Sequence, residues 1–278
     1  MKKIKYLLMI ILIFFLETIP KKHLQMYWFH GCPNGGDYFG KWLLEKMGFI
    51  VHFSKKPEIL VSGSSLGIIN SFDSNPKIWG PGFHNYEDKI YINNLNNIYA
   101  VRGKLSFKKL NVTKKIALGD PGLLLSHFFK SRAKKDYDIC IISHFIDYGI
   151  FKKRYGDKFN VINMGSNNIE KIANSISRCN FIFSSSLHGI IFSHSLGVPA
   201  IHLENKELVS KRNFKFKDYY SVLDIPYIKE DLKIVNFNTI IKNYSKDRFK
   251  YLPNKKLIKR IQKDLLLSFP FNNFKNKL

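Results

Sequence analysis

Short apolar runs alternate with helical patterns through the first half of the chain. Residues 24–30 are mostly apolar and aromatic, the Gly-rich segment GCPNGGD follows, and residues 38–47 carry apolar side chains at helical spacing. Further apolar runs at residues 58–64, 77–83 and 97–101 end in Gly, Ser, Pro or Arg. This alternation of strands and helices predicts a parallel sheet.

The second half repeats the same alternation. Strands are predicted at residues 138–143, 159–164 and 198–203, and an amphipathic helix at residues 168–179. The segment from Phe181 to Leu203 predicts a buried strand that ends in three serines and is followed at once by a helix. A second parallel sheet is therefore expected.

Residues 129–137 are charged and aperiodic, which marks them as the linker. We predict an α/β fold with a domain at 23–130, a domain at 131–278 that ends in helices, and an additional segment at 1–22. Two Rossmann-like domains of this kind face each other across a cleft. Open α/β sheets bind ligands at the carboxyl ends of their strands, so the cleft is the expected site.

The segment 1–22 has three lysines before an apolar run at 6–16. Eleven residues rise too little to cross a hydrocarbon core of about 30 Å, and no small-x-small cleavage site precedes Pro20. We interpret the segment as a membrane-surface anchor. A signal peptide, or a start codon assigned upstream of Met26, are the alternatives.

Composition narrows the partners only in part. The formal charge of +24 favours anionic partners, but the basic residues are spread along the chain, so nucleic acid is not expected. The three cysteines lack any metal-ligand spacing. Cys140 and Cys179 are expected to be core residues, and a reducing, cytoplasmic location follows from this cysteine pattern.

The strongest candidate for chemistry is His188, in the first turn of the helix after the three serines. Ser185 or Ser186 is suited to cap this helix, and the free N–H groups at such a terminus attract anions. We expect the pKa of His188 to lie near the range useful for proton transfer. His194 and His202 are expected to be structural.

A second candidate motif is NGGD, at Asn34 to Asp37. Gly35 and Gly36 allow backbone to approach a ligand, and Asp37 either caps the next helix or binds substrate. Arg102 follows a strand, so its planar fork is expected at the cleft edge, where it suits a carboxylate or phosphate. The GDPG segment containing Asp120 is interpreted as a structural turn.

Several reaction classes lack their signatures. No GxGxxG fingerprint, Walker lysine, HExxH, nucleophile elbow or paired-carboxylate signature occurs, which disfavours dinucleotide, ATP and hydrolase chemistry. No metal-ligand cluster is visible in the sequence, and no metal or cofactor is expected.

In order along the chain, eight segments resemble the polysaccharide pyruvyl transferase family over residues 24–224. The segments are NGGD (34–37), VSGSSLG (61–67), IWGPGF (78–83), VRGKLS (101–106), GDPGLL (119–124), SSSLHG (184–189), SLGVPAI (195–201) and KFKDYY (215–220). The resemblance implies a fold like that of the GT-B glycosyltransferases and transfer of a pyruvyl group from phosphoenolpyruvate to two hydroxyls of a sugar. The sugar belongs to a cell-surface polysaccharide, such as an exopolysaccharide or lipopolysaccharide, or to its lipid-linked precursor.

The resemblance assigns catalytic roles to His188, Arg102 and Asp37. Many relatives have an arginine two residues before the histidine, where this chain has Ser186, and Lys211, Arg212 and Lys215 are the basic residues that can replace it. The substrate-binding residues are then expected to be Asn34, Gly35, Gly36, Ser185, Ser186, Gly189 and Lys215.

Two other functions stay open on the residues alone. One is a nucleotide-sugar glycosyltransferase on the same fold. The other is a noncatalytic protein that binds polyanions or a membrane, which the net charge and the segment 1–22 favour. For the transferase we expect a cytoplasmic location at the inner face of the membrane, where phosphoenolpyruvate is available.

Overall fold

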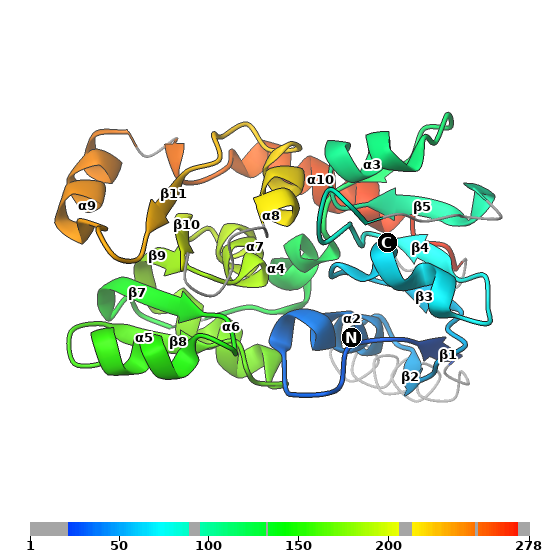
Figure 1. Cartoon of the computed structure of the whole chain (residues 1–278), viewed down its shortest axis with the longest axis horizontal. Coiled ribbons are helices and arrows are strands. Elements are labelled where there is room, and N and C mark those ends of the chain that lie inside the picture. Colours follow the sequence, from blue (N-terminus) through cyan, green and yellow to red (C-terminus); the bar gives the residue numbers. More distant parts are fainter. Residues whose placement is uncertain (1–21, 89–94, 132, 206–212, 248–249, 272–278) are drawn as a thin grey trace, which may run out of the picture.

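The chain forms two parallel sheets surrounded by helices (Figure 1). The computed structural model describes residues 22–88, 95–131, 133–205, 213–247 and 250–271. The first sheet has six strands in the order β2-β1-β3-β4-β5-β6. Its strands are β1 (His23–Met26), β2 (Ile50–Phe53), β3 (Ile59–Leu60), β4 (Lys77–Trp79), β5 (Ile98–Val101) and β6 (Ala117–Leu118).

The second sheet has five strands in the order β11-β10-β9-β7-β8. Its strands are β7 (Tyr137–Ser143), β8 (Asn160–Asn163), β9 (Cys179–Ser184), β10 (Ala200–Glu204) and β11 (Lys229–Asp231). Every strand pair in both sheets is parallel. The predicted α/β class with two parallel sheets is confirmed.

Helices connect the strands in both halves. The α-helices are α2 (Gly35–Lys46), α3 (Lys104–Leu110), α4 (Leu125–Phe128), α5 (Tyr148–Tyr155), α6 (Ile169–Ser177), α7 (Leu187–Ser195), α8 (Asn213–Tyr220), α9 (Phe237–Lys246) and α10 (Lys255–Leu267). Within the described ranges, the 3₁₀ helices are η1 (Ser65–Ser71), η2 (Leu95–Asn97) and η3 (Pro121–Leu124). Helix α2 begins three residues before the predicted start because Asn34, not Asp37, is its N-cap.

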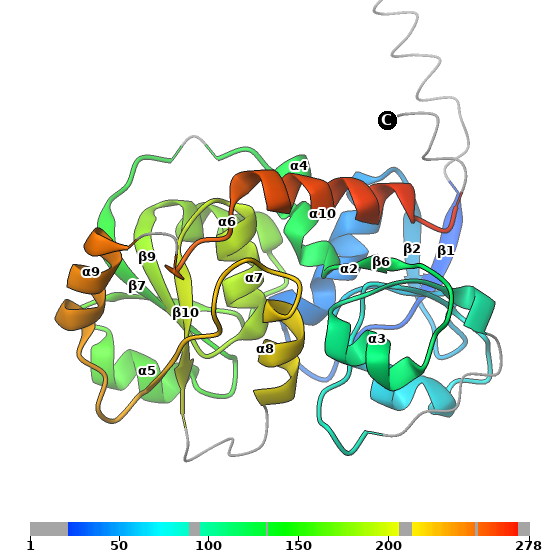
Figure 2. The ribbon, with the colours of Figure 1, turned by 90° about the horizontal axis from the view of Figure 1, so that it is seen from above.

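One hydrophobic core connects the two halves. It joins Leu24 and Trp79 of the first sheet to Ile142 and Ile190 of the second half. Helix α2 contacts α6 and α7, and α7 packs against η3. Helix α10 returns across the molecule to pack on β6 and η3 of the first half (Figure 2). The division at residue 130 stays a prediction, and the shared core positions residues from both halves at the seam between the sheets.

Cys140 and Cys179 are fully buried in the core, as predicted, and they also form a disulfide that the sequence did not indicate. They are 39 residues apart in sequence, and their Cα atoms lie 5.9 Å apart. The spacing of the cysteines in the sequence does not reveal this bond. The two residues come together only because β7 and β9 are neighbours in the second sheet. The odd number and wide spacing of the three cysteines favour a reducing compartment, and the disulfide removes the support for that inference.

The described residues contain no helix that is both long enough and apolar enough to cross a membrane. The predicted anchor at 1–22 lies outside the described residues except for Lys22. Lys22 is already part of the fold, since its carbonyl accepts a hydrogen bond of 3.0 Å from the backbone N–H of Ile50.

Candidate functional site

His188 lies where the sequence places it, in the first turn of α7 directly after β9. Ser186 is the N-cap, and its Oγ accepts a hydrogen bond from the Gly189 N–H at 3.4 Å. Ser185 precedes it, and its Oγ accepts from the His144 N–H at 2.9 Å. These two hydrogen bonds fix the path of the chain from β9 into α7. Only 10% of the His188 side chain is exposed.

The second predicted motif meets His188 from the other half of the molecule. Asn34 caps α2, with its Oδ1 accepting from the Gly36 N–H at 3.0 Å and its Nδ2 donating to Asp37 Oδ2 at 2.6 Å. A Cβ on Gly36 would overlap Nδ1 of His188 and would lie 2.8 Å from its Cγ. The glycine is therefore required for the N-terminus of α2 to lie against the imidazole.

Gly35 serves the same close approach rather than an open ligand surface. Its N–H donates to the Met164 carbonyl at 2.8 Å, and a Cβ there would lie 2.6 Å from Ile172 Cδ1. Gly189 is closely packed as well, because a Cβ on it would lie 2.8 Å from Ile142 Cγ2. These glycines, expected to bind substrate, bring helices into contact with each other and with the sheet.

Asp120 is the site residue that the sequence analysis missed. It caps η3 in the GDPG segment, where its Oδ1 accepts from the Gly122 N–H at 2.8 Å, and it is fully buried. The same Oδ1 lies 3.8 Å from Nε2 of His188. GDPG follows a strand of a parallel sheet, so the rule that singled out Arg102 also applied to Asp120.

Burial determines the charge state of these groups. Burial, followed by the positive charges of Lys215 and Arg102 and then His144, lowers the pKa of His188 to about 3. The expected pKa near neutrality is therefore wrong for the unliganded protein, because the imidazole is packed into the seam.

The two carboxyl groups shift in the opposite direction. Burial raises the pKa of Asp120 to about 7, although the Gly122 N–H and Arg102 oppose the shift. Burial also raises the pKa of Asp37 to about 6 against the pull of Lys215. A neutral imidazole thus lies beside carboxyl groups that can hold protons close to neutral pH.

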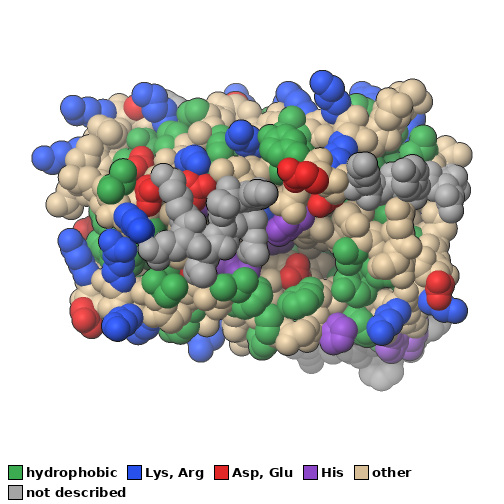
Figure 3. All heavy atoms as spheres, in the orientation of Figure 1, with side chains coloured by type: hydrophobic (Ala, Val, Ile, Leu, Met, Phe, Trp, Pro, Cys, Tyr) green, Lys and Arg blue, Asp and Glu red, His purple; other side chains and the backbone are tan. Residues whose placement is uncertain are grey.

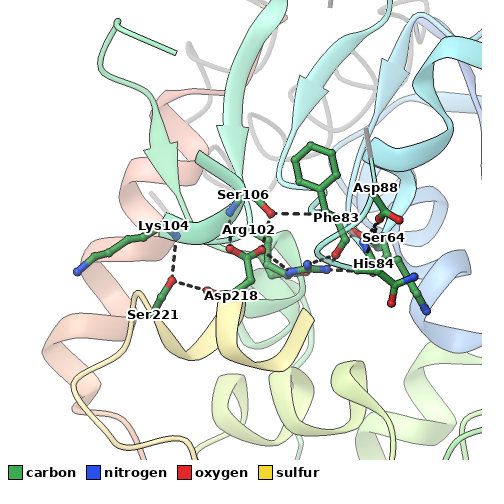
Figure 4. A network of polar contacts seen from close by, with 12 residues as sticks. Ser64, Phe83, His84, Asp88, Arg102, Lys104, Ser106, Asp218 and Ser221 are labelled. Atoms are coloured by element: carbon green, nitrogen blue, oxygen red, sulfur yellow. Dashed lines mark hydrogen bonds and ion pairs between the residues drawn. The ribbon is translucent and has the colours of Figure 1, made fainter. Parts of the chain in front are cut away.

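Arg102 is not at an exposed edge but fully buried in a polar network (Figure 4). Its Nε donates to Asp218 Oδ2 at 2.9 Å, its Nη1 donates to Ser64 Oγ at 3.1 Å, and its Nη2 donates to the Phe83 carbonyl. Asp218 also accepts from the N–H and Oγ of Ser106 at 2.8 and 2.6 Å. The fork therefore joins four sequence motifs to one another, and its catalytic role stays a prediction.

Lys215 lies on α8, three residues before Asp218, and its side chain is buried. It lines a cavity of about 30 Å³ at the carboxyl ends of β7, β9 and β10, together with Ser185 and Glu204. Its charge acts on both His188 and Asp37. The predicted substitutes Lys211 and Arg212 lie outside the described residues.

The other two histidines singled out in this half are buried against tyrosines. His194 Nδ1 lies 3.0 Å from Tyr219 Oη, and His202 Nδ1 lies 2.7 Å from Tyr227 Oη. A structural role for both stays a prediction, and His202 also lines the cavity that contains Lys215 and Ser185. Within the described ranges, no three His, Cys, Asp or Glu side chains gather where they could hold a metal ion.

Comparison with known proteins gives two matches. A sequence profile described as polysaccharide pyruvyl transferase matches residues 31–207, which is more than half of the chain. An uncharacterised protein of Acanthamoeba polyphaga mimivirus is 31% identical over 247 residues, with 82% of each chain covered. The range that the profile matches includes the Asn34–Asp37 motif, Arg102, Asp120 and His188.

Proposed function

The chain belongs to the polysaccharide pyruvyl transferase family, and from this premise we propose that it forms a pyruvate ketal on a sugar with phosphoenolpyruvate as donor. Membership of the family makes it a transferase of pyruvyl groups in polysaccharide biosynthesis. The donor, the ketal and the lipid-linked form of the acceptor are our proposal. It needs no further cofactor, because phosphoenolpyruvate is itself the activated co-substrate.

The proposed reaction requires two hydroxyl attacks on one carbon. The first hydroxyl oxygen bonds to C2 of the donor while C3 gains a proton and becomes a methyl group. The second hydroxyl oxygen then replaces the phosphate at C2, and its proton leaves on the released hydrogen phosphate. The ketal and the hydrogen phosphate together contain all the atoms and charge of the reactants. The site must therefore move protons and bind an anion.

The contact between His188 and the first turn of α2 is the observation that carries the proposal. His188 is partly accessible, neutral in the unliganded protein and within the field of Lys215. A neutral imidazole can accept a hydroxyl proton, and a bound phosphate would offset the nearby positive charges and raise its pKa. Asp37, with its raised pKa, supplies a second proton-transfer group at the same helix terminus.

The buried cations suit the donor's anionic groups. Lys215 supplies positive charge near His188 and Asp37, and we assign it the role of the arginine that Ser186 replaces. Asn34 and Ser185 provide polar atoms around the same seam. Arg102 contributes to the electrostatic field of the site, while its hydrogen bonds hold the surrounding loops.

On this proposal the two sheets form halves of a GT-B-like enzyme with the substrates between them. Acceptor sugars on a lipid carrier would place the enzyme at the inner face of the membrane, with residues 1–22 as anchor. The family match favours pyruvyl transfer over a nucleotide-sugar glycosyltransferase. Lys and Arg side chains are dispersed over the face in Figure 3, which gives a polyanion-binding protein little support there.

The test is product analysis by mass spectrometry. Purified protein is incubated with a panel of nucleotide-linked and lipid-linked sugars and with either phosphoenolpyruvate or UDP-sugars. We expect acceptor-dependent phosphate release and the mass increment of a pyruvate ketal with phosphoenolpyruvate. A glycosyl increment with UDP-sugars, and none with phosphoenolpyruvate, would replace this proposal with the glycosyltransferase.

A further inference from the structure

Two neighbouring side chains at the seam, His188 and Asp120, each have a buried polar atom without a hydrogen-bond partner among the described residues. Among the described residues, neither Nε2 of His188 nor Oδ2 of Asp120 has a partner. The Asp120 carboxyl is fully buried and approaches Nε2 through Oδ1 at 3.8 Å. An unmade hydrogen bond on a buried polar atom costs about 1–3 kcal/mol, so two such atoms on neighbouring side chains call for an explanation.

We propose that Asp120 is the proton-exchange partner of His188 in the pyruvyl transfer, a positioning residue that acts on substrate only through the imidazole. The inference rests on the proposed function for its chemistry and on the seam geometry for its existence. Asp120 is fully buried, whereas His188 keeps 10% of its side chain exposed. Substrate therefore meets the histidine and not the aspartate.

The pair can carry the proton through one turnover without net change. The imidazole gives its Nδ1 proton, on the side of the ring that contacts Gly36, to C3 of the donor while the Asp120 O–H proton passes to Nε2. Nδ1 then accepts the proton of the first hydroxyl, and the Nε2 proton returns to Asp120. One proton has moved from hydroxyl to carbon. A separation of 3.8 Å must shorten for this transfer, as catalytic hydrogen bonds do when substrate binds.

Charged and titratable neighbours of Asp120 come from three elements. Arg102 follows β5, Asp218 and Tyr219 lie on α8, and His188 lies on α7. Asp218 disfavours charge on Asp120, and Arg102 opposes this effect while it is already paired with Asp218. Burial remains the largest influence, so Asp120 can hold its proton near neutral pH.

The neighbours of His188 disfavour a second proton on the ring. Lys215 of α8, Arg102 and His144 all lower its pKa, and Gly36 in the first turn of α2 lies against Nδ1 of the ring. The proton of the pair therefore resides on Asp120 in the unliganded protein. A phosphate in the site would shift the balance toward the imidazole.

Asp120→Asn separates the proposed role from the helix cap. Asparagine retains an oxygen for the Gly122 N–H and caps about as well as aspartate, but it cannot hold an exchangeable carboxyl proton. Asp231→Asn is the matched control, because Asp231 accepts from the backbone N–H two residues ahead, at 2.9 Å on the edge strand β11. The control should keep wild-type turnover and melting temperature.

The first measurement needs no substrate. With ¹³C-labelled aspartate side chains, NMR should show one carboxyl in the unliganded protein that is protonated at pH 6, titrates near pH 7, and disappears in Asp120→Asn. An Asp120 carboxyl that is already ionised at pH 6 would contradict the proposed proton exchange with His188, even if the protein does transfer pyruvyl groups. If the variant fails to fold, wild type alone still decides the question, because the absence of any aspartate carboxyl that titrates near pH 7 contradicts the pair.

The second measurement uses the pH dependence of turnover. Wild-type kcat should fall as the pH rises through about 7, while Asp120→Asn should lose this limb and about 10²-fold in kcat with KM for phosphoenolpyruvate unchanged. Wild-type turnover and an unaltered pH profile in Asp120→Asn would contradict the inference. Failure of all pyruvyl transfer with a confirmed carboxyl titration would contradict the proposed function instead.

Discussion

Arg102 shows how a residue can belong to a functional motif and still be held as part of the core. Its guanidinium is fully buried and its Nε pairs with Asp218 at 2.9 Å. Lysine would keep the charge but not the planar fork that reaches Ser64 and the Phe83 carbonyl. Loss of these bonds leaves buried acceptors without donors, which lowers the free energy of unfolding even when no substrate is bound.

We therefore predict that Arg102→Lys lowers the free energy of unfolding by about 3 kcal/mol, measured by guanidinium denaturation. Arg178→Lys is the control, because its pair with Asp136 is 42% exposed on both sides and should change stability by less than about 1 kcal/mol. Equal effects of the two variants would mean that the buried network contributes no more than a surface ion pair.

At the scale of elements, the site depends on how closely α2 approaches α7. Gly36→Ala should push the His188 ring from its position, because the added Cβ would overlap Nδ1. A displacement of about 1 Å at a catalytic group can cost roughly 10²-fold in turnover. We predict a loss of this order in an assay of phosphate release, with donor binding retained.

Gly149→Ala in α5 provides the matched comparison. A Cβ at Gly149 has no atom within 4 Å, so alanine should stabilise the protein by about 0.5 kcal/mol and leave turnover unchanged. If both alanine variants have wild-type turnover, the packing of α2 on α7 does not position the histidine.

Elements with a strong apolar pattern were predictable, and weakly buried ones were not. The serine-rich passage from β9 into α7 follows directly from the sequence, since both elements are almost entirely buried. Strand β2 and helix α5 were missed because each buries a single side chain, Val51 and Phe151. A single buried residue gives no periodicity to detect.

Contacts between distant segments were beyond the sequence for a different reason. The Asp120–His188 approach and the Cys140–Cys179 bond both join residues far apart in the chain, and their geometry arises only when the elements pack. Burial of His188 by α2 has the same origin, so the sequence alone predicts too high a pKa for this histidine. The sequence identified which residues lie at strand ends, but it could not show which of them meet.

At the scale of the whole molecule, folding should be linked to pH through buried groups of opposite behaviour. Burial lowers the pKa of His188, His194 and His202 to about 3, from 6.5. Below pH 6.5 the unfolded chain therefore binds more protons at these sites, and stability falls as the pH falls. Asp37 and Asp120, with raised pKa values, bind more protons in the folded state and oppose this loss.

The difference between wild type and Asp120→Asn isolates one of these groups. Asp120→Asn lacks the carboxyl that binds a proton in the folded wild type. As the pH is lowered from 6 to 5, the free energy of unfolding of the variant should therefore fall by about 1.4 kcal/mol relative to wild type. Chemical unfolding at several pH values measures this difference while effects of the remaining charges cancel. Parallel stability curves would show that Asp120 is not protonated in the folded state.

The beginning of the folded unit is a separate whole-molecule prediction. A chain that starts at Lys22 should be soluble and melt cooperatively, because β1 begins at His23 and Leu24 and Met26 are buried. A chain that starts at Tyr27 lacks β1, which lies between β2 and β3, and should aggregate. Aggregation of the longer chain as well would place part of residues 1–21 in the core.

The central claim, that His188 moves protons in pyruvyl transfer, is tested most directly with His188→Gln. Glutamine retains a hydrogen-bonding side chain of similar size but cannot exchange a proton. On one preparation, turnover with phosphoenolpyruvate and an accepted sugar is measured beside the melting temperature and donor binding. The account predicts a loss of about 10²-fold or more in turnover with donor binding and melting retained. Near-normal turnover in a destabilised variant would contradict it.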